Sequence, residues 1–97
     1  MPVYVTLFKW TDSGVKNVKE TPAKIAESRK TAEDLGGKVL GLYVTMGDYD
    51  LVSVVEWPND ETAATTALAV SSRGNARTVT MRAFTEREFA DIAKKLP

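Results

Sequence analysis

The chain of 97 residues contains no cysteine and no histidine. Without cysteine there is no disulfide or thiolate, and without histidine there is no imidazole base and no common protein ligand for zinc or haem. The neighbouring carboxylates Asp48 and Asp50 are too few for a calcium site, which takes about six to eight oxygen ligands. We therefore expect no metal site and no cofactor, and many classes of enzyme are excluded.

The sequence also lacks an excess of charge of either sign, since 13 lysines and arginines balance 13 aspartates and glutamates. Proteins that bind nucleic acid or anionic membranes usually carry a basic surplus, so we expect neither partner. No apolar run approaches the roughly 20 residues that span a bilayer. Residues 1–10 alternate as a strand does and do not resemble a signal peptide. We expect a cytoplasmic protein.

Hydrophobic periodicity switches between that of a strand and that of a helix along the chain. Because no linker or repeat interrupts this pattern, we expect a single domain over residues 1–97. Thr21-Pro22 is typical of a helix start, and Thr85 and Glu88 have the spacing of a capping box. Residues 11–14 are predicted to form a turn. The predicted strands are Pro2–Trp10, Lys38–Met46, Asp50–Trp57 and Arg77–Phe84, and the predicted helices cover 21–35, 58–73 and the residues from 85 onward.

The resulting order, β-α-β-β-α-β followed by a helix, is that of the ferredoxin-like α+β fold. Its four-stranded antiparallel sheet places the first strand between the fourth and the third, with the second beyond the third. A tight connection between the second and third strands favours a glycine with positive φ and an aspartate that bonds to its own backbone. We therefore interpret Gly47-Asp48-Tyr49-Asp50 as a hairpin, and we expect its carboxylates to form ion pairs with Lys9 or Arg77.

Alternation divides each strand between two faces of the sheet. One face is almost purely aliphatic, and we expect the helices to cover it. The other carries aromatic and hydroxyl side chains and one arginine, so we expect a second copy of the sheet to cover it and form a dimeric α+β barrel, with Trp10 and Trp57 as interface anchors. The aliphatic face is expected to contain Val3, Val5, Leu7, Leu40, Leu42, Val44, Met46, Val52, Val54, Val79, Met81 and Ala83.

Tyr43 and Arg82 are the leading functional candidates on the aromatic face, where Gly41 leaves room beside the arginine. A guanidinium suits an anionic oxygen, and aromatic walls with a few polar groups are typical of small-molecule sites. The alternative is that Arg82 pairs with an acidic group of the partner subunit and the aromatic residues simply pack. The candidate ligand-binding residues are Thr6, Phe8, Tyr43, Ser53, Thr80 and Arg82.

Several stretches of the chain resemble the GYD-domain family of small bacterial and archaeal proteins, which is named for a glycine-tyrosine-aspartate motif. Here the motif is Gly47-Asp48-Tyr49-Asp50, with one residue between the glycine and the tyrosine. The resemblance extends over residues 4–14, 37–46, 73–78 and 82–85, and so covers essentially the whole chain. It implies a dimeric α+β barrel, and it assigns no established activity to any residue.

Three functions remain open. The first is the binding of a small anionic or aromatic molecule by a homodimer, or a multiple of dimers. The second is a cofactor-free monooxygenase or isomerase, by analogy with other barrel-forming families, in which Arg82 would lower the pKa of Tyr43 so that it exchanges protons. The third is a purely structural or interaction module. The fold alone does not choose among them.

Overall fold

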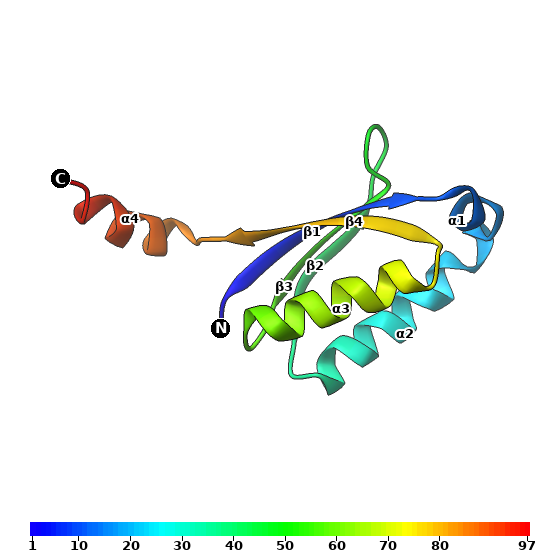
Figure 1. Ribbon diagram of the computed structural model, residues 1–97, viewed down its shortest axis with the longest axis horizontal. Coiled ribbons are helices and arrows are strands. Elements are labelled where there is room, and N and C mark those ends of the chain that lie inside the picture. The colour runs from blue at the N-terminus through cyan, green and yellow to red at the C-terminus, as the bar shows by residue number, and fades with distance from the viewer.

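The computed structural model describes residues 1–97 as one antiparallel sheet with two long helices on one side and a helical arm (Figure 1). The strand order is β2-β3-β1-β4, which confirms the ferredoxin-like α+β prediction. The elements in chain order are β1 (Val3–Trp10), α1 (Asp12–Lys16), the short 3₁₀ helix η1 (Val18–Glu20), α2 (Thr21–Asp34), β2 (Lys38–Val44), β3 (Leu51–Glu56), α3 (Asp60–Ser72), β4 (Ala76–Ala83) and α4 (Glu86–Lys94).

The helix ends follow the predicted signals closely. The Asn59 side chain accepts a hydrogen bond from the Thr62 backbone N–H at 2.8 Å and begins α3. Gly36 has φ of 86° just after α2, where a left-handed residue ends a helix without strain. Thr85 and Glu88 form both hydrogen bonds of a capping box at the start of α4. Local sequence therefore determines where these elements begin and end.

The segment after β1 differs from the prediction. Residues 11–14 belong to the beginning of the short helix α1, because the Thr11 hydroxyl accepts a hydrogen bond from the Gly14 backbone N–H at 3.2 Å. Thr21-Pro22 does begin α2, as predicted, but directly after η1: Glu20 is the N-cap, Thr21 is the first helical residue, and Pro22 occupies the first turn, where no N–H is required. The residues predicted to form a turn therefore begin a short additional helix between β1 and η1.

The connection between β2 and β3 is the predicted hairpin, with Gly47 at a φ of +104°. The Asp50 carboxylate accepts a hydrogen bond from the Trp10 backbone N–H at 2.8 Å, and the Asp50 backbone N–H donates to the Phe8 carbonyl at 2.9 Å. Neither Asp48 nor Asp50 forms an ion pair, so the predicted pairing with Lys9 or Arg77 is wrong. Asp50 instead fixes the hairpin to the end of β1.

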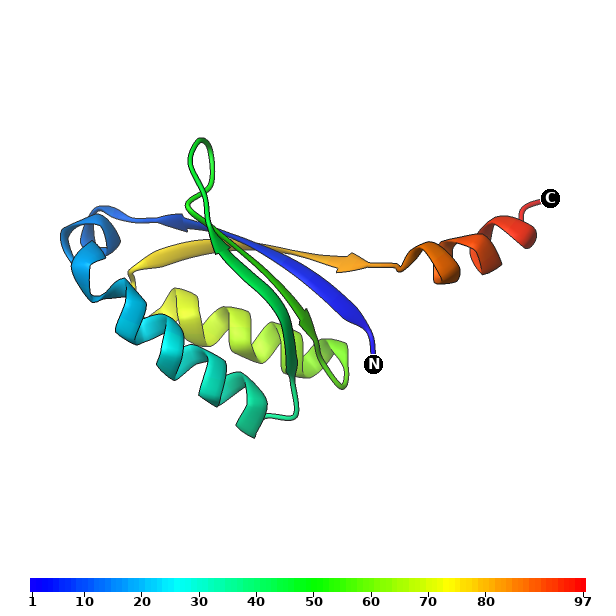
Figure 2. The ribbon, with the colours of Figure 1, turned by 180° about the vertical axis from the view of Figure 1, so that it is seen from behind.

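The two faces of the sheet are the reverse of the prediction. Helices α2 and α3 cover the aromatic face, and no element covers the aliphatic face (Figures 1 and 2). The predicted interface anchor Trp57 is 5% exposed and lies in the core. The helices bring small residues to the sheet, and bulky aromatic side chains pack against them in one buried cluster. The buried cluster consists of Tyr4, Val55 and Trp57 from the sheet side with Ala32 of α2 and Ala63 of α3.

A β-bulge in β2 changes which side chains share a face. Val39 pairs with Val55, but Gly41 pairs with Val54, so Leu40 is an extra residue in the ladder. Beyond the bulge, Leu42 faces the helices opposite Ser53, and strict alternation across β2 is therefore a wrong prediction.

Helix α4 continues from β4 away from the body of the molecule, and the C-terminus lies at the far end of this arm (Figures 1 and 2). The radius of gyration is 14.7 Å, whereas a compact chain of this length would have roughly 12.5 Å. Only 9 of 97 residues are buried. The single chain thus leaves much of its apolar surface without a partner. None of its helices combines the length and the apolar character needed to cross a bilayer.

Candidate functional site

The open face of the sheet, defined as the face turned away from α2 and α3, has an aliphatic centre. Val5 on the central strand β1 lies between Val54 of β3 and Met81 of β4. Met81 is 44% exposed and the neighbouring Val79 is 47% exposed, although both are apolar. Charged residues lie only toward the ends of the strands on this face, namely Lys9, Arg77, Glu56 and Lys38. An apolar centre with a polar rim is the usual anatomy of a protein–protein interface.

Helix α4 presents a second uncovered apolar surface. Phe89 is 61% exposed and Ile92 is 40% exposed at helical spacing, and Leu96, just beyond the end of the helix, is 69% exposed. The arm is tied to the body by the ion pair between Arg82 and Glu88, at 3.6 Å. The Thr85 backbone N–H holds the pKa of the Glu88 carboxyl below its ordinary value, so this glutamate is ionised and caps the helix near neutral pH. The arm is a formed helix with its apolar side exposed.

Arg82 has a structural environment within its own chain. Its guanidinium lies 4.6 Å from the Phe84 ring centroid and 5.8 Å from that of Tyr4. It donates hydrogen bonds to the backbone carbonyls of Val3, at 3.4 Å, and Ala83. Its acidic neighbour is Glu88 of the same chain. Arg82 therefore connects β1, β4 and the start of α4.

The Tyr4 hydroxyl joins β1 to the start of α3 by donating a hydrogen bond to the Asp60 carboxylate. This hydrogen bond raises the pKa of Tyr4, and burial and the negative charge of Asp60 act in the same direction. Tyr4 is thus held in its neutral form, and it is a packing residue of the core.

The six predicted ligand-binding residues are not on one surface. Tyr43 pairs with Val52 on the open face, whereas Arg82 pairs with Tyr4 on the face of the helices. The predicted pairing of Tyr43 with Arg82 is therefore wrong, because the bulge at Leu40 moves Tyr43 to the other side of the sheet. The room that Gly41 leaves is filled by the Tyr43 ring, since a Cβ on Gly41 would lie 3.0 Å from Tyr43 Cε2.

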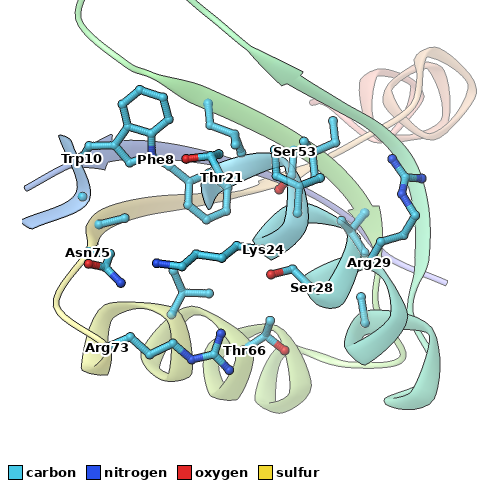
Figure 3. Close-up of a pocket in the computed structure, with 18 of the residues that line it drawn as sticks. Phe8, Trp10, Thr21, Lys24, Ser28, Arg29, Ser53, Thr66, Arg73 and Asn75 are labelled. Carbon is cyan, nitrogen blue, oxygen red and sulfur yellow. The ribbon is translucent and has the colours of Figure 1, made fainter. Parts of the chain in front are cut away.

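The other five residues face the helices. The Thr6 and Thr80 hydroxyls are 3.1 Å apart and share a hydrogen bond on this side of the sheet. Phe8 and Ser53 line a cavity of about 180 Å³ between the sheet and helices α2 and α3 (Figure 3). The structure thus brings together two of the six predicted residues in a space that has room for a ligand.

This cavity also contains residues that sequence reasoning missed. Figure 3 shows Lys24 and Arg29 on α2 and Arg73 at the end of α3, all bordering the same space as Phe8. A signal was present in the sequence, because Thr21, Ile25, Ser28 and Ala32 follow the spacing of one helix face. Because several residues on that helix face are polar or small, their pattern alone does not indicate that the face packs toward the sheet.

Comparison with known proteins adds two findings. The family model described as the GYD domain matches residues 4–93. The chain is also 36% identical, over 97 residues and 99% of each sequence, to a protein of Thermus thermophilus named "Glutamine synthetase and cystathionine beta-lyase binding protein". The name of that relative describes a protein that binds two enzymes.

Proposed function

The chain belongs to the GYD-domain family, and we propose that it acts as a homodimeric protein-interaction module. A second copy packs against the open face of the sheet, and the α4 arm binds a partner protein. The observation that carries this proposal is the uncovered aliphatic face around Val5. The name of the relative supports an interaction role in this family. We also propose that the protein is cytoplasmic, as its composition leads us to expect.

A second copy is the occupant that best fits the open face. A two-fold interface needs only one patch that is complementary to itself, and a flat aliphatic centre meets this condition. Contiguous apolar patches of this kind are rare on monomers. The chain has no further element of its own to place there, because α2 and α3 lie on the other face and α4 points away (Figure 2). The dimer is therefore built through the aliphatic face.

The α4 arm has the features of a helix that binds in a groove of another protein. Such helices contact their partner through apolar residues at positions i, i+3, i+4 and i+7. In α4 the first three of these positions are Phe89, Ile92 and Ala93, and Leu96 stands at the fourth, just after the helix ends at Lys94. The capping box forms the helix before any partner binds, which lowers the entropic cost of association. We propose that glutamine synthetase and cystathionine β-lyase are the partners to test first, because the relative is named for them.

Biolayer interferometry tests partner binding. It uses glutamine synthetase and cystathionine β-lyase purified from the organism that encodes this chain. The variant Phe89→Ser/Ile92→Ser removes the apolar side of α4, and Arg87→Ser on the opposite side of the helix is the matched control. We expect the wild-type chain and the control to bind at least one of the enzymes, and the double variant to bind at least about 100-fold more weakly. Light scattering should show the same molar mass for all three proteins.

Two results would contradict this assignment. If neither enzyme binds the wild-type chain, these partners are wrong for this protein. If the double variant loses its dimeric mass, α4 packs on the second copy and is not the partner-binding element.

A second candidate function is the binding of a small molecule, and the cavity between the sheet and the helices favours it. Phe8 and Ser53 were predicted as ligand-binding residues, and both line this space. The cavity lies on the opposite side of the sheet from the proposed dimer interface, so one chain has room for both functions. We propose no catalysis by Tyr43 and Arg82, since they lie on opposite faces.

A further inference from the structure

We infer that the cavity between the sheet and helices α2 and α3 is a binding site for small carboxylates with an apolar body of about the size of one ring. This inference rests on the second candidate function, small-molecule binding, and adds the chemical class and orientation of the ligand. It is independent of the dimer and of partner binding by α4.

The cavity lies where the helices bring short side chains to the sheet. Ser28 and Ala32 of α2 and Thr66 of α3 line the space opposite Phe8 and Val55. Ala32 packs in the buried cluster with Val55, but beside this cluster the short side chains leave part of the space between the helices and the sheet open. Its volume is about 180 Å³. An apolar cavity of about 150 Å³ is large enough to bind benzene, so this one accommodates a ring or a short branched chain.

The charged residues that line the cavity are all basic. Lys24, Arg29 and Arg73 border it, and no aspartate or glutamate does, although the whole chain contains equal numbers of acidic and basic residues. Lys24 is also 3.7 Å from Glu20, but the Lys24 side chain is 47% exposed and that contact is a weak surface pair. The lining therefore favours an anion over a cation or a neutral ligand.

The position of the basic groups gives the orientation of the ligand. Figure 3 shows that Lys24 reaches from α2 toward Asn75 and that Arg73 lies at this same end, whereas Arg29 lies at the opposite end. A carboxylate at the Lys24 end would accept charge-assisted hydrogen bonds while the apolar body contacts Phe8 and the interior. Arginine is well suited to this role because its planar guanidinium matches a carboxylate.

The two tryptophans provide a direct readout of this site. Trp10 and Trp57 both line the cavity, and the chain has no other tryptophan. Their two indole N–H signals in a ¹⁵N correlation spectrum are therefore reporters beside this cavity, and neither tryptophan lies on the open face or on α4. The same spectrum shows whether each variant is folded.

The test compares 4-methylbenzoate with its neutral isostere 4-methylbenzamide by titration of these signals. We expect 4-methylbenzoate to shift both indole signals and to bind at least about tenfold more tightly than the amide. The variant Lys24→Gln/Arg73→Gln should lose this preference, so that both compounds bind it equally. Lys30→Gln is the matched control, since Lys30 is also on α2 but does not line the cavity, and it should keep the preference.

Each contrary result is distinct. Equal binding of the acid and the amide to the wild-type chain would overturn the anionic class while leaving small-molecule binding in place. A failure of both compounds to shift either indole signal would overturn the site and the second candidate function together. An equal loss of preference in Lys30→Gln would show that general surface charge is responsible, and would overturn the role of Lys24 and Arg73.

Discussion

The face of the sheet that the helices cover is less uniformly apolar than the open face. A simple hydrophobic rule would predict the reverse. The covered face carries Tyr4, Thr6, Ser53 and Trp57, with hydroxyl groups among its aromatic rings. The open face carries almost only aliphatic side chains around Val5. The Tyr4 hydroxyl, the polar end of a buried aromatic residue on this face, has a partner in the Asp60 carboxylate, and the Thr6 and Thr80 hydroxyls share a hydrogen bond where the face is exposed.

The difference supports the proposal that another molecule covers the more uniformly apolar face. Obligate interfaces resemble a domain core cut in half, and their residues are as apolar as those of an interior. A face that packs against the chain's own helices can be more varied, since each polar group is positioned by the same fold. Composition alone therefore does not show which face the helices cover.

The largest expected effect comes from placing a charge at the centre of the open face. Val5→Glu would bury two unpaired carboxylates in each dimer, so we expect the dissociation constant to rise at least about 100-fold. Analytical ultracentrifugation across a concentration series measures this change. The matched control is Leu68→Glu, since Leu68 is 70% exposed on α3, away from the open face. An equal rise of the dissociation constant in both variants would contradict the proposal that the dimer forms through the open face.

On the covered face, the packing of Trp57 predicts the next largest effect. A Cβ on Gly37 would lie 2.6 Å from Trp57 Cζ3 and 3.0 Å from the Ala32 carbonyl oxygen. We expect Gly37→Ala to lower the free energy of unfolding by about 1–3 kcal/mol, because a packed ring and a helix backbone must both shift. Urea denaturation at a fixed protein concentration measures this. Unchanged stability would mean that the tryptophan is loosely packed.

A double-mutant cycle tests whether Tyr43 and Arg82 lie on different faces. The changes Tyr43→Phe and Arg82→Gln should be additive to within about 0.5 kcal/mol in the free energy of unfolding, because distant residues without shared partners do not couple. Arg82→Gln alone should be the more destabilising, since it removes the contacts to Glu88 and to two backbone carbonyls. A coupling energy well above about 1 kcal/mol would contradict the separation of the two side chains.

The smallest expected effect is the pH dependence of α4. Because the pKa of Glu88 is lowered in the folded chain, its contribution to helix stability is fully present above its ordinary pKa and is lost as pH falls through the lowered value. Glu88→Gln should flatten this part of the helicity profile measured by circular dichroism between pH 7 and pH 2. Asp91→Asn, which removes an α4 carboxylate outside the capping box, is the control. An unchanged profile in Glu88→Gln would exclude this capping effect.

The order of the elements was predictable because their start and end signals are local. Asn59, Gly36 and the pair Thr85 and Glu88 act within a few residues of their own positions. The hairpin at Gly47 was predictable for the same reason, since only a glycine takes its positive φ without strain.

The assignment of faces was not predictable by alternation, because it depends on contacts between distant elements. The bulge at Leu40 had one local signal, the glycine at position 41 inside a strand. The cavity depends on how far the short side chains of α2 and α3 lie from the sheet, and no local pattern encodes that separation. For this reason the sequence predicts Phe8 and Ser53, which line the cavity, but not Lys24 and Arg73, which line it too.

The most direct test of the dimer through the open face is the molar mass of the wild-type chain in solution, measured by size-exclusion chromatography with light scattering from micromolar to millimolar concentration. The predicted result is a mass of twice 10.6 kDa, or an even multiple of 10.6 kDa, that persists on dilution. A mass of 10.6 kDa throughout this range would contradict it, since the aliphatic face would then be exposed to water in the native protein.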